Sequence, residues 1–178
     1  TAQNPDIYFQ GREVQNAWFD RAPLIVAGYM EKITQITGRP YRPFDYYGAP
    51  DARDVIVAMG SVCDTAKETV DYLISKGQKA GLLQVRLYRP FCPDKLLEAI
   101  PAGAKKIAVL DRTKEPGSQG EPLYMDVTAA LANAGRFDVK VIGGRYGLGS
   151  KDTPPEDIFS VFAELDKVQP RRRFTLGI

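Results

Sequence analysis

KKIAVLDRTKEPGSQGEPLYMD, residues 105–126, is the stretch that decides the fold. Residues 107–110 within it are all apolar, which predicts a strand buried on both faces and therefore a parallel sheet covered by helices on each side. The loop that follows is rich in charge and turn residues, as in α/β proteins whose strand ends contact ligands or partners. A solvated turn between strand and helix is the alternative. The charged residues are Asp111, Arg112, Lys114, Glu115 and Glu121.

Strands and helices are predicted to alternate along the rest of the chain. Residues 55–59, 81–88 and 139–142 read as further strands, and helical patterns separate them. Thr65 with Glu68 forms a capping-box pattern, and Thr153 stands before the last helix as a second expected cap. This order predicts an α/β fold: an open, mainly parallel sheet with helices on both faces.

A second unusual loop is GGRYGLGSKD, residues 143–152. Its glycine spacing matches neither the dinucleotide-binding fingerprint nor the Walker A loop. Glycines allow unusual backbone angles or close approach to another surface, and Arg145 and Lys151 add positive charge. A local structural turn and a docking loop are both compatible with these residues.

Composition narrows the possible activities. The 178 residues carry a net charge of +2, too small to suggest a nucleic-acid binder, and include no histidine and two cysteines. The lack of histidine removes the commonest general base. Cys63 and Cys92 cannot build a zinc or iron–sulfur site by themselves; they fit reduced thiols of an intracellular protein, although a bridge between them stays open. No apolar run is long enough to span a membrane.

The turn Gly60-Ser61 between a strand and a helix is a possible anion site. With Arg86 and Arg89 near the end of the next strand, it could hold a phosphate group. A plain tight turn is the simpler interpretation, because no glycine-rich fingerprint is present.

The two ends of the chain suggest connections to other domains. We expect residues 1–15 to be an extended linker from an upstream domain, residues 16–170 to form one α/β domain, and residues 171–178 to begin a linker to a downstream domain. The arginines 171–173 fit a solvated linker, and the alternating apolar tail after them resembles a strand that joins something absent.

Several long motifs together resemble one family. LDRTKEPGSQGEPLYMDV (110–127), VIVAMGSVCDTAKETVDYL (55–73), VRLYRPF (85–91) and GGRYGLGSKD (143–152) are similar to the second domain of pyruvate:ferredoxin (flavodoxin) oxidoreductase. TAQNPDIYFQGRE at the start and FTLGI at the end resemble the junctions of that domain with its neighbours. The resemblance implies a fold like the transketolase C-terminal domain, and it covers essentially the whole chain.

The resemblance also implies a function for the complete enzyme. That family oxidatively decarboxylates pyruvate to acetyl-CoA and CO2 with thiamine diphosphate, Mg and [4Fe–4S] clusters, and passes electrons to ferredoxin or flavodoxin in the cytoplasm. The Gly-Asp-Gly thiamine motif and the cysteine quartets of such clusters are absent from this sequence. The resemblance therefore supplies no catalytic, cofactor-binding or metal-binding residue here.

The expected partners are sibling domains of the same polypeptide and a second subunit, with no nucleic acid and no membrane. Six residues of the two polar loops are the candidates for interdomain contact. They are Arg112, Lys114, Glu115, Glu121, Arg145 and Lys151. The alternative is a stand-alone α/β module that binds a phosphate-bearing ligand such as coenzyme A.

Overall fold

The computed structural model describes residues 2–178 and divides into two compact units. The helical unit extends to Pro43 and also contains Leu87–Cys92. The sheet unit contains Phe44–Arg86 and Pro93–Ile178. The expected division at residues 15 and 170 into linker, domain and linker stays a prediction.

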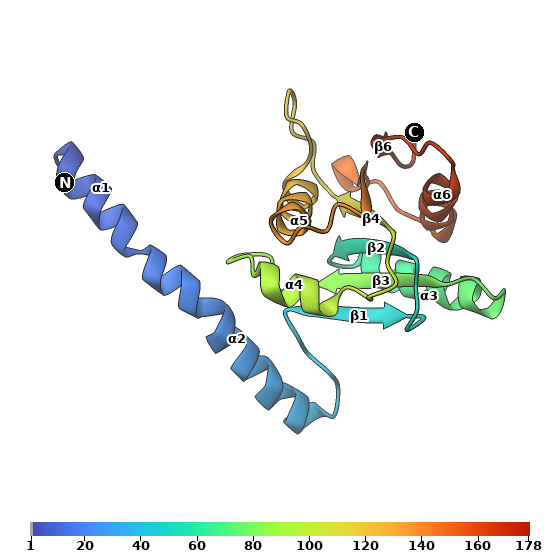
Figure 1. The fold of residues 1–178 in the computed structure, drawn as a ribbon, viewed down its shortest axis with the longest axis horizontal. Coiled ribbons are helices and arrows are strands. Elements are labelled where there is room, and N and C mark those ends of the chain that lie inside the picture. The colour runs from blue at the N-terminus through green and yellow to red at the C-terminus, as the bar shows by residue number, and fades with distance from the viewer. Residues whose placement is uncertain (1) are drawn as a thin grey trace. The chain divides into compact units, whose positions relative to one another are not determined.

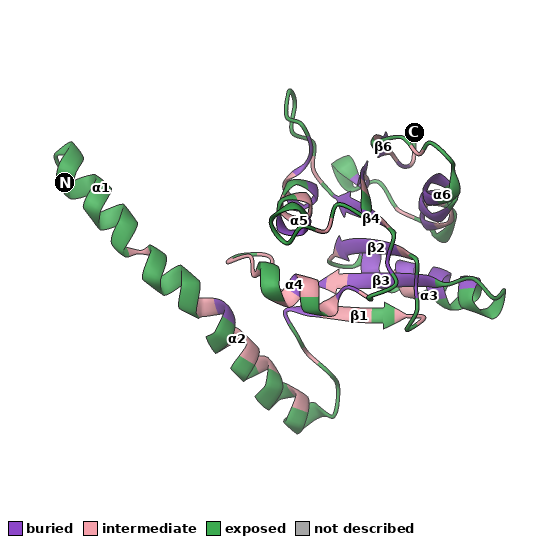
Figure 2. Cartoon of the chain, in the orientation of Figure 1, coloured by how far each residue is buried: buried purple, intermediate pink, exposed green. Residues whose placement is uncertain are grey.

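The sheet unit is built on a six-stranded sheet in the order β1-β3-β2-β4-β5-β6, and all neighbours except β1 and β3 run parallel (Figure 1). Most residues of the central strands β2, β3 and β4 are apolar and buried, as Figure 2 shows. The strands are β1 (Phe44–Gly48), β2 (Asp54–Met59), β3 (Ala80–Val85), β4 (Lys106–Asp111), β5 (Lys140–Arg145) and β6 (Arg173–Thr175).

Helices cover both faces of this sheet, so the predicted fold class is confirmed. Because successive side chains of a strand point to opposite faces, Ile56 and Ala108 pack in one core with α3 and α6. Helices α4 and α5 contact each other on the other face. The helices are α3 (Val62–Ser75), α4 (Pro93–Ala99), α5 (Pro122–Asn133) and α6 (Pro155–Asp166), and a short 3-10 turn, η1 (Leu148–Ser150), follows β5.

The C-terminal tail differs from the expectation. The tail was expected to join an element outside this chain, but its strand β6 pairs with β5 of this sheet, with Phe174 opposite Gly144. The arginines 171–173 also make contacts within the sheet unit. Arg171 binds Glu164, Arg172 donates to the Tyr124 hydroxyl at 3.4 Å, and Arg173 binds Glu121.

The aromatic stretch 44–48, which the sequence pattern did not identify as a strand, is strand β1, antiparallel to β3. The two predicted helix caps were also wrong. Helix α3 begins at Val62, so Thr65 lies inside it and its carbonyl accepts the Thr69 hydroxyl at 3.1 Å. Helix α6 begins at Pro155 after Pro154, without a side-chain cap.

The helical unit contains α1 (Pro5–Val14) and α2 (Asn16–Thr37). The extended linker expected for residues 1–15 is therefore wrong in conformation, because Asn4 caps a helix by accepting the Ile7 N–H at 2.9 Å. Helix α2 ends at Gly38, which has φ 69°. Most of its apolar side chains are exposed.

Among residues 2–178, none of the helices combines the length and apolar character that crossing a membrane requires.

Candidate functional site

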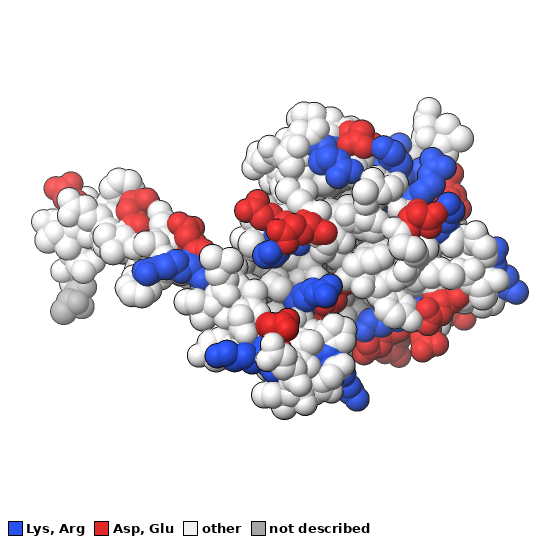
Figure 3. Space-filling model, turned by 60° about the horizontal axis from the view of Figure 1, so that its bottom comes forward, with Lys and Arg blue, Asp and Glu red and all other residues white. Residues whose placement is uncertain are grey.

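The candidate site is the edge of the sheet where β2, β4 and β5 end. Three loops meet there: the turn Gly60-Ser61, the charged loop 112–121, and residues 146–154 after β5. This is the edge at which open α/β folds place ligands and partners. On the face that Figure 3 shows, basic and acidic side chains lie interspersed.

Asp111, the last residue of β4, is committed to the start of α5. Its two carboxylate oxygens accept the backbone N–H groups of Leu123 and Tyr124, each at 3.0 Å. The residue is buried, and burial raises the pKa of its carboxyl, while the two N–H donors act to lower that pKa. The positive end of α5 is thus filled by the protein's own carboxylate.

Glu121 precedes α5 and is almost fully buried, with 2% of its side chain exposed. Its Oε1 accepts hydrogen bonds from Arg145 Nη1 and Arg173 Nη2, each at 3.2 Å. Burial pushes the pKa of Glu121 upward, but the two arginines outweigh it and hold that pKa below its usual value. Arg145 also donates to Thr175 at 2.9 Å. The cluster therefore joins α5 to β5 and β6.

The other four candidates lie in exposed positions. Arg112 donates from Nε to the Gly147 carbonyl at 2.9 Å. The side chains of Lys114, Glu115 and Lys151 make no hydrogen bond or ion pair with another residue of the described range 2–178. Glu121, Arg145 and Arg112 thus make contacts inside the sheet unit, and Lys114, Glu115 and Lys151 are exposed. Contact of any of them with a sibling domain stays a prediction.

Residues 143–152 were compatible with a local structural turn or a docking loop, and the surroundings of three glycines favour a structural role for them. Gly143 and Gly144 belong to β5, and a Cβ on Gly144 would lie 2.6 Å from the Phe174 ring. Gly147 has φ 63°, and a Cβ there would lie 3.0 Å from Arg112 Nε. These three glycines serve contacts inside the sheet unit.

The two arginines expected to hold a phosphate with Gly60-Ser61 have contacts of their own. Arg86 pairs with Asp45 of β1, and the Arg89 guanidinium lies 3.9 Å from the centre of the Tyr88 ring. Ser61 instead lines a cavity of about 320 Å³ with Arg112 and Lys151. The sequence missed this set because its members are some 50 and 90 residues away from Ser61.

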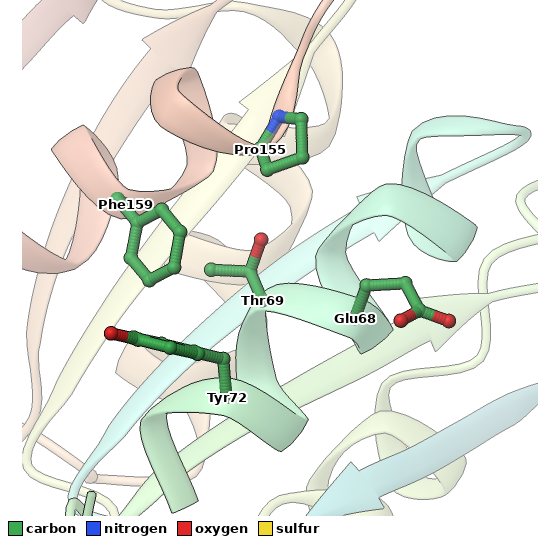
Figure 4. A pocket seen from close by; sticks show the side chains of 5 residues that line it. All are labelled: Glu68, Thr69, Tyr72, Pro155 and Phe159. Atoms are coloured by element: carbon green, nitrogen blue, oxygen red, sulfur yellow. The ribbon is translucent and has the colours of Figure 1, made fainter.

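A second hollow lies between α3 and α6 and measures about 490 Å³ (Figure 4). The rings of Tyr72 and Phe159 form its apolar floor and meet edge to face, with centroids 5.4 Å apart. Glu68 is its one charged lining residue. Such a surface suits apolar contact and offers no acid–base pair.

Neither cysteine forms a disulfide. Cys63 is buried, and burial raises the pKa of its thiol to about 11, whereas Cys92 is half-buried. Within the described part of the chain, no group of three or more His, Cys, Asp or Glu side chains could hold a metal ion.

Comparison with known proteins matches residues 52–158, more than half of the chain, to the family model "Pyruvate:ferredoxin oxidoreductase core domain II". The chain is 56% identical over 178 residues to a pyruvate:ferredoxin oxidoreductase of Moorella thermoacetica. It is 54% identical over 178 residues to a pyruvate-flavodoxin oxidoreductase of Enterobacter agglomerans. All of this chain is covered in both matches, and it spans 15% of the length of each relative.

Among solved structures, the chain is similar to a split-gene transketolase, an inactive β4 tetramer, with a TM-score of 0.46 and 16% identity. That match covers 69% of this chain and 39% of the other. The family itself is established by the sequence match over residues 52–158. This chain belongs to the family of pyruvate:ferredoxin oxidoreductase core domain II.

Proposed function

We propose that this chain is a structural, interdomain part of a pyruvate:ferredoxin or pyruvate:flavodoxin oxidoreductase. The complete enzyme would oxidatively decarboxylate pyruvate to acetyl-CoA and CO2 in the cytoplasm and pass the electrons to ferredoxin or flavodoxin. Its other domains and a second subunit would be the partners of this chain, and other parts of the enzyme would perform the reaction.

The observation that supports this role most strongly is the engagement of the buried carboxylates. Asp111 caps α5, Glu121 binds two arginines, and Glu164 binds Arg171 and Lys167. A carboxylate held by such donors is poorly placed to exchange protons with a substrate. The contacts of Asp111 and Glu121 stabilise the edge of the sheet where β4 and β5 end.

The residues present do not fit the cofactors of the complete enzyme. Iron–sulfur clusters need sets of cysteine thiolates, and the chain has two cysteines, one of them buried with a pKa of about 11. Among the described residues, no acidic or thiol cluster suits Mg²⁺. We therefore assign thiamine diphosphate, Mg²⁺ and the [4Fe–4S] clusters to other parts of the enzyme.

Exposed apolar side chains on α2 supply a surface for interdomain contact. Trp18, Ile25, Tyr29 and Ile36 are each more than half exposed. Their spacing of seven, four and seven residues places them on one face of the helix. A stripe of this kind on a soluble protein marks an interaction surface.

The test replaces Ile25 and Tyr29 together by Ser, in the complete oxidoreductase and in the 178-residue chain. The matched control is Glu31→Ser, which changes another exposed residue of α2 outside this stripe. We expect the double substitution to impair assembly and pyruvate-dependent electron transfer of the complete enzyme, while the melting temperature of the chain stays unchanged. Normal assembly and activity of the double variant would contradict the interdomain role of this face.

A further inference from the structure

The strand order of the sheet creates a switch point between β2 and β4. From β2 the chain passes through α3 to β3 on one side, then returns through α4 to β4 on the other side of β2. The connections that leave β2 and β4 therefore diverge, and α3 and α5 cover opposite faces. In open α/β sheets, such a switch point between neighbouring parallel strands is where small ligands bind.

The 320 Å³ cavity lies at this switch point. Ser61, Val62 and Thr65 contribute from the start of α3 after β2, and Arg112 contributes from the loop after β4. Tyr146 and residues 150–154 contribute from the segment after β5. Three neighbouring strand ends thus supply its wall, and most of the exposed lining is polar.

The charges of the lining favour an anion. Arg112 and Lys151 are its cations and Asp152 is its one carboxylate, which leaves a formal excess of one positive charge. Ser61, Thr65, Ser150 and Thr153 add hydroxyl groups that can donate to an oxyanion. The Tyr146 hydroxyl already donates to the Met59 carbonyl at 3.3 Å. Burial raises the pKa of this tyrosine to about 12, so the phenol adds no negative charge.

The structure also holds Arg112 in place for such a role. Its Nε donates to the Gly147 carbonyl at 2.9 Å, and this fixes the plane of the guanidinium. The two terminal nitrogens make no hydrogen bond to another residue in the range 2–178. A guanidinium anchored through Nε keeps its remaining N–H groups for a tetrahedral or planar oxyanion. The Lys151 ammonium likewise makes no ion pair with a described residue.

We propose that this cavity binds the phosphate group of a small molecule, with Arg112 and Lys151 as the charged ligands and the hydroxyls of Ser61 and Thr65 as further donors. The volume exceeds that of one phosphate, so the cavity also accommodates an organic part of modest size. A free phosphate ion and a phosphate ester share this chemistry.

The experiment follows backbone amide resonances of the 178-residue chain during titration with orthophosphate and with glycerol 3-phosphate. We expect saturable shifts at residues 60–65, 112 and 146–153. The double variant Arg112→Gln, Lys151→Gln should bind about tenfold more weakly or worse, because two charge-assisted contacts are lost. Tighter binding of glycerol 3-phosphate would identify an ester, and equal binding a free ion.

Two controls make the result decisive. Lys140→Gln removes an exposed lysine at the amino end of β5, and its affinity should equal that of the original chain. Arg53, Lys105 and Lys106 line another cavity, at the opposite edge of the sheet, together with Asp54 and Asp166. Shifts confined to that basic cluster would overturn the proposal. Undiminished binding of phosphate by the double variant would also overturn the proposal. So would a titration in which malonate binds more tightly than phosphate, because the cavity would then be a carboxylate site.

Discussion

Arg145 Nη1 lies 3.2 Å from Glu121 Oε1, and this contact ties the end of β5 to the start of α5 across 24 residues of sequence. The carboxylate is almost fully buried, and Arg173 is its second cationic partner. A buried carboxylate that loses a partner has a large energetic cost. The cluster is therefore expected to matter for stability.

Arg145→Ala should lower the free energy of unfolding by about 2–4 kcal/mol, because Arg173 alone would remain to neutralise a buried charge. Urea unfolding of the 178-residue chain measures this change. The control Lys114→Ala removes an exposed charge of the neighbouring loop and should change stability by less than about 0.5 kcal/mol. Equal effects of the two substitutions would show that the Glu121 contact contributes nothing.

Glu164 is expected to make the free energy of unfolding depend on pH in the acid range. Its contacts with Arg171, above all, and with Lys167 lower its pKa to about 2, although burial opposes them. A lowered native pKa means that the stabilisation is complete above the unfolded pKa, about 4.3, and is lost as pH falls through about 2.

The difference in unfolding free energy between the original chain and Glu164→Gln should be largest near neutral pH and vanish toward pH 2. Urea titrations at a series of pH values measure it. A difference that grows as the pH falls would have the wrong sign for this contact.

The two cysteines should differ in reactivity. Cys63 is buried and its pKa is raised to about 11 by burial, with smaller effects of nearby charges, so little thiolate forms at neutral pH. Cys92 is only half-buried. Iodoacetamide at pH 7.5 should modify Cys92 at least about 100-fold faster than Cys63 in the native chain. In urea both should react, and Cys92→Ser should abolish the fast phase in the native chain.

Gly144 is predicted to be essential for the position of β6. A Cβ there would lie 2.6 Å from the Phe174 ring and 2.7 Å from the Leu110 side chain. Gly144→Ala should therefore cost about 1–3 kcal/mol of stability through overpacking. It should also speed hydrogen exchange of the Leu176 amide, which donates to the Arg145 carbonyl at 2.8 Å.

Gly28→Ala is the matched control for that substitution, because a Cβ on Gly28 meets nothing within 4 Å. Exchange of the Leu176 amide should be unchanged in this variant. If Gly144→Ala behaves in the same way, Phe174 does not hold β6 against the sheet.

The sequence predicted the features that depend on local pattern. The apolar run at 107–110 became the buried strand β4, and the alternation of strands and helices gave the correct fold class.

The remaining features depend on contacts between distant residues. Glu121 binds Arg145 and Arg173, which are 24 and 52 positions away in the sequence. The sequence alone does not show whether a charged loop residue has such a partner in the fold. Strand β1 was missed because Pro43 and Gly48 flank its aromatic residues, and its pairing with β3 is a long-range property. The start of α3 was placed too late because the turn after Met59 is tight, with φ 80° at Gly60.

The central claim is that the buried carboxylates of this chain maintain its structure and take no part in the reaction. Asp111→Asn in the complete oxidoreductase tests it most directly, because Asn keeps one acceptor oxygen for a backbone N–H at the start of α5 but cannot act as a general base. The measurement is kcat for pyruvate-dependent reduction of ferredoxin, well below the melting temperature. We predict a value within about twofold of the original enzyme, whereas a loss of about 100-fold or more in a folded enzyme, the size expected for a lost general base, would contradict the account.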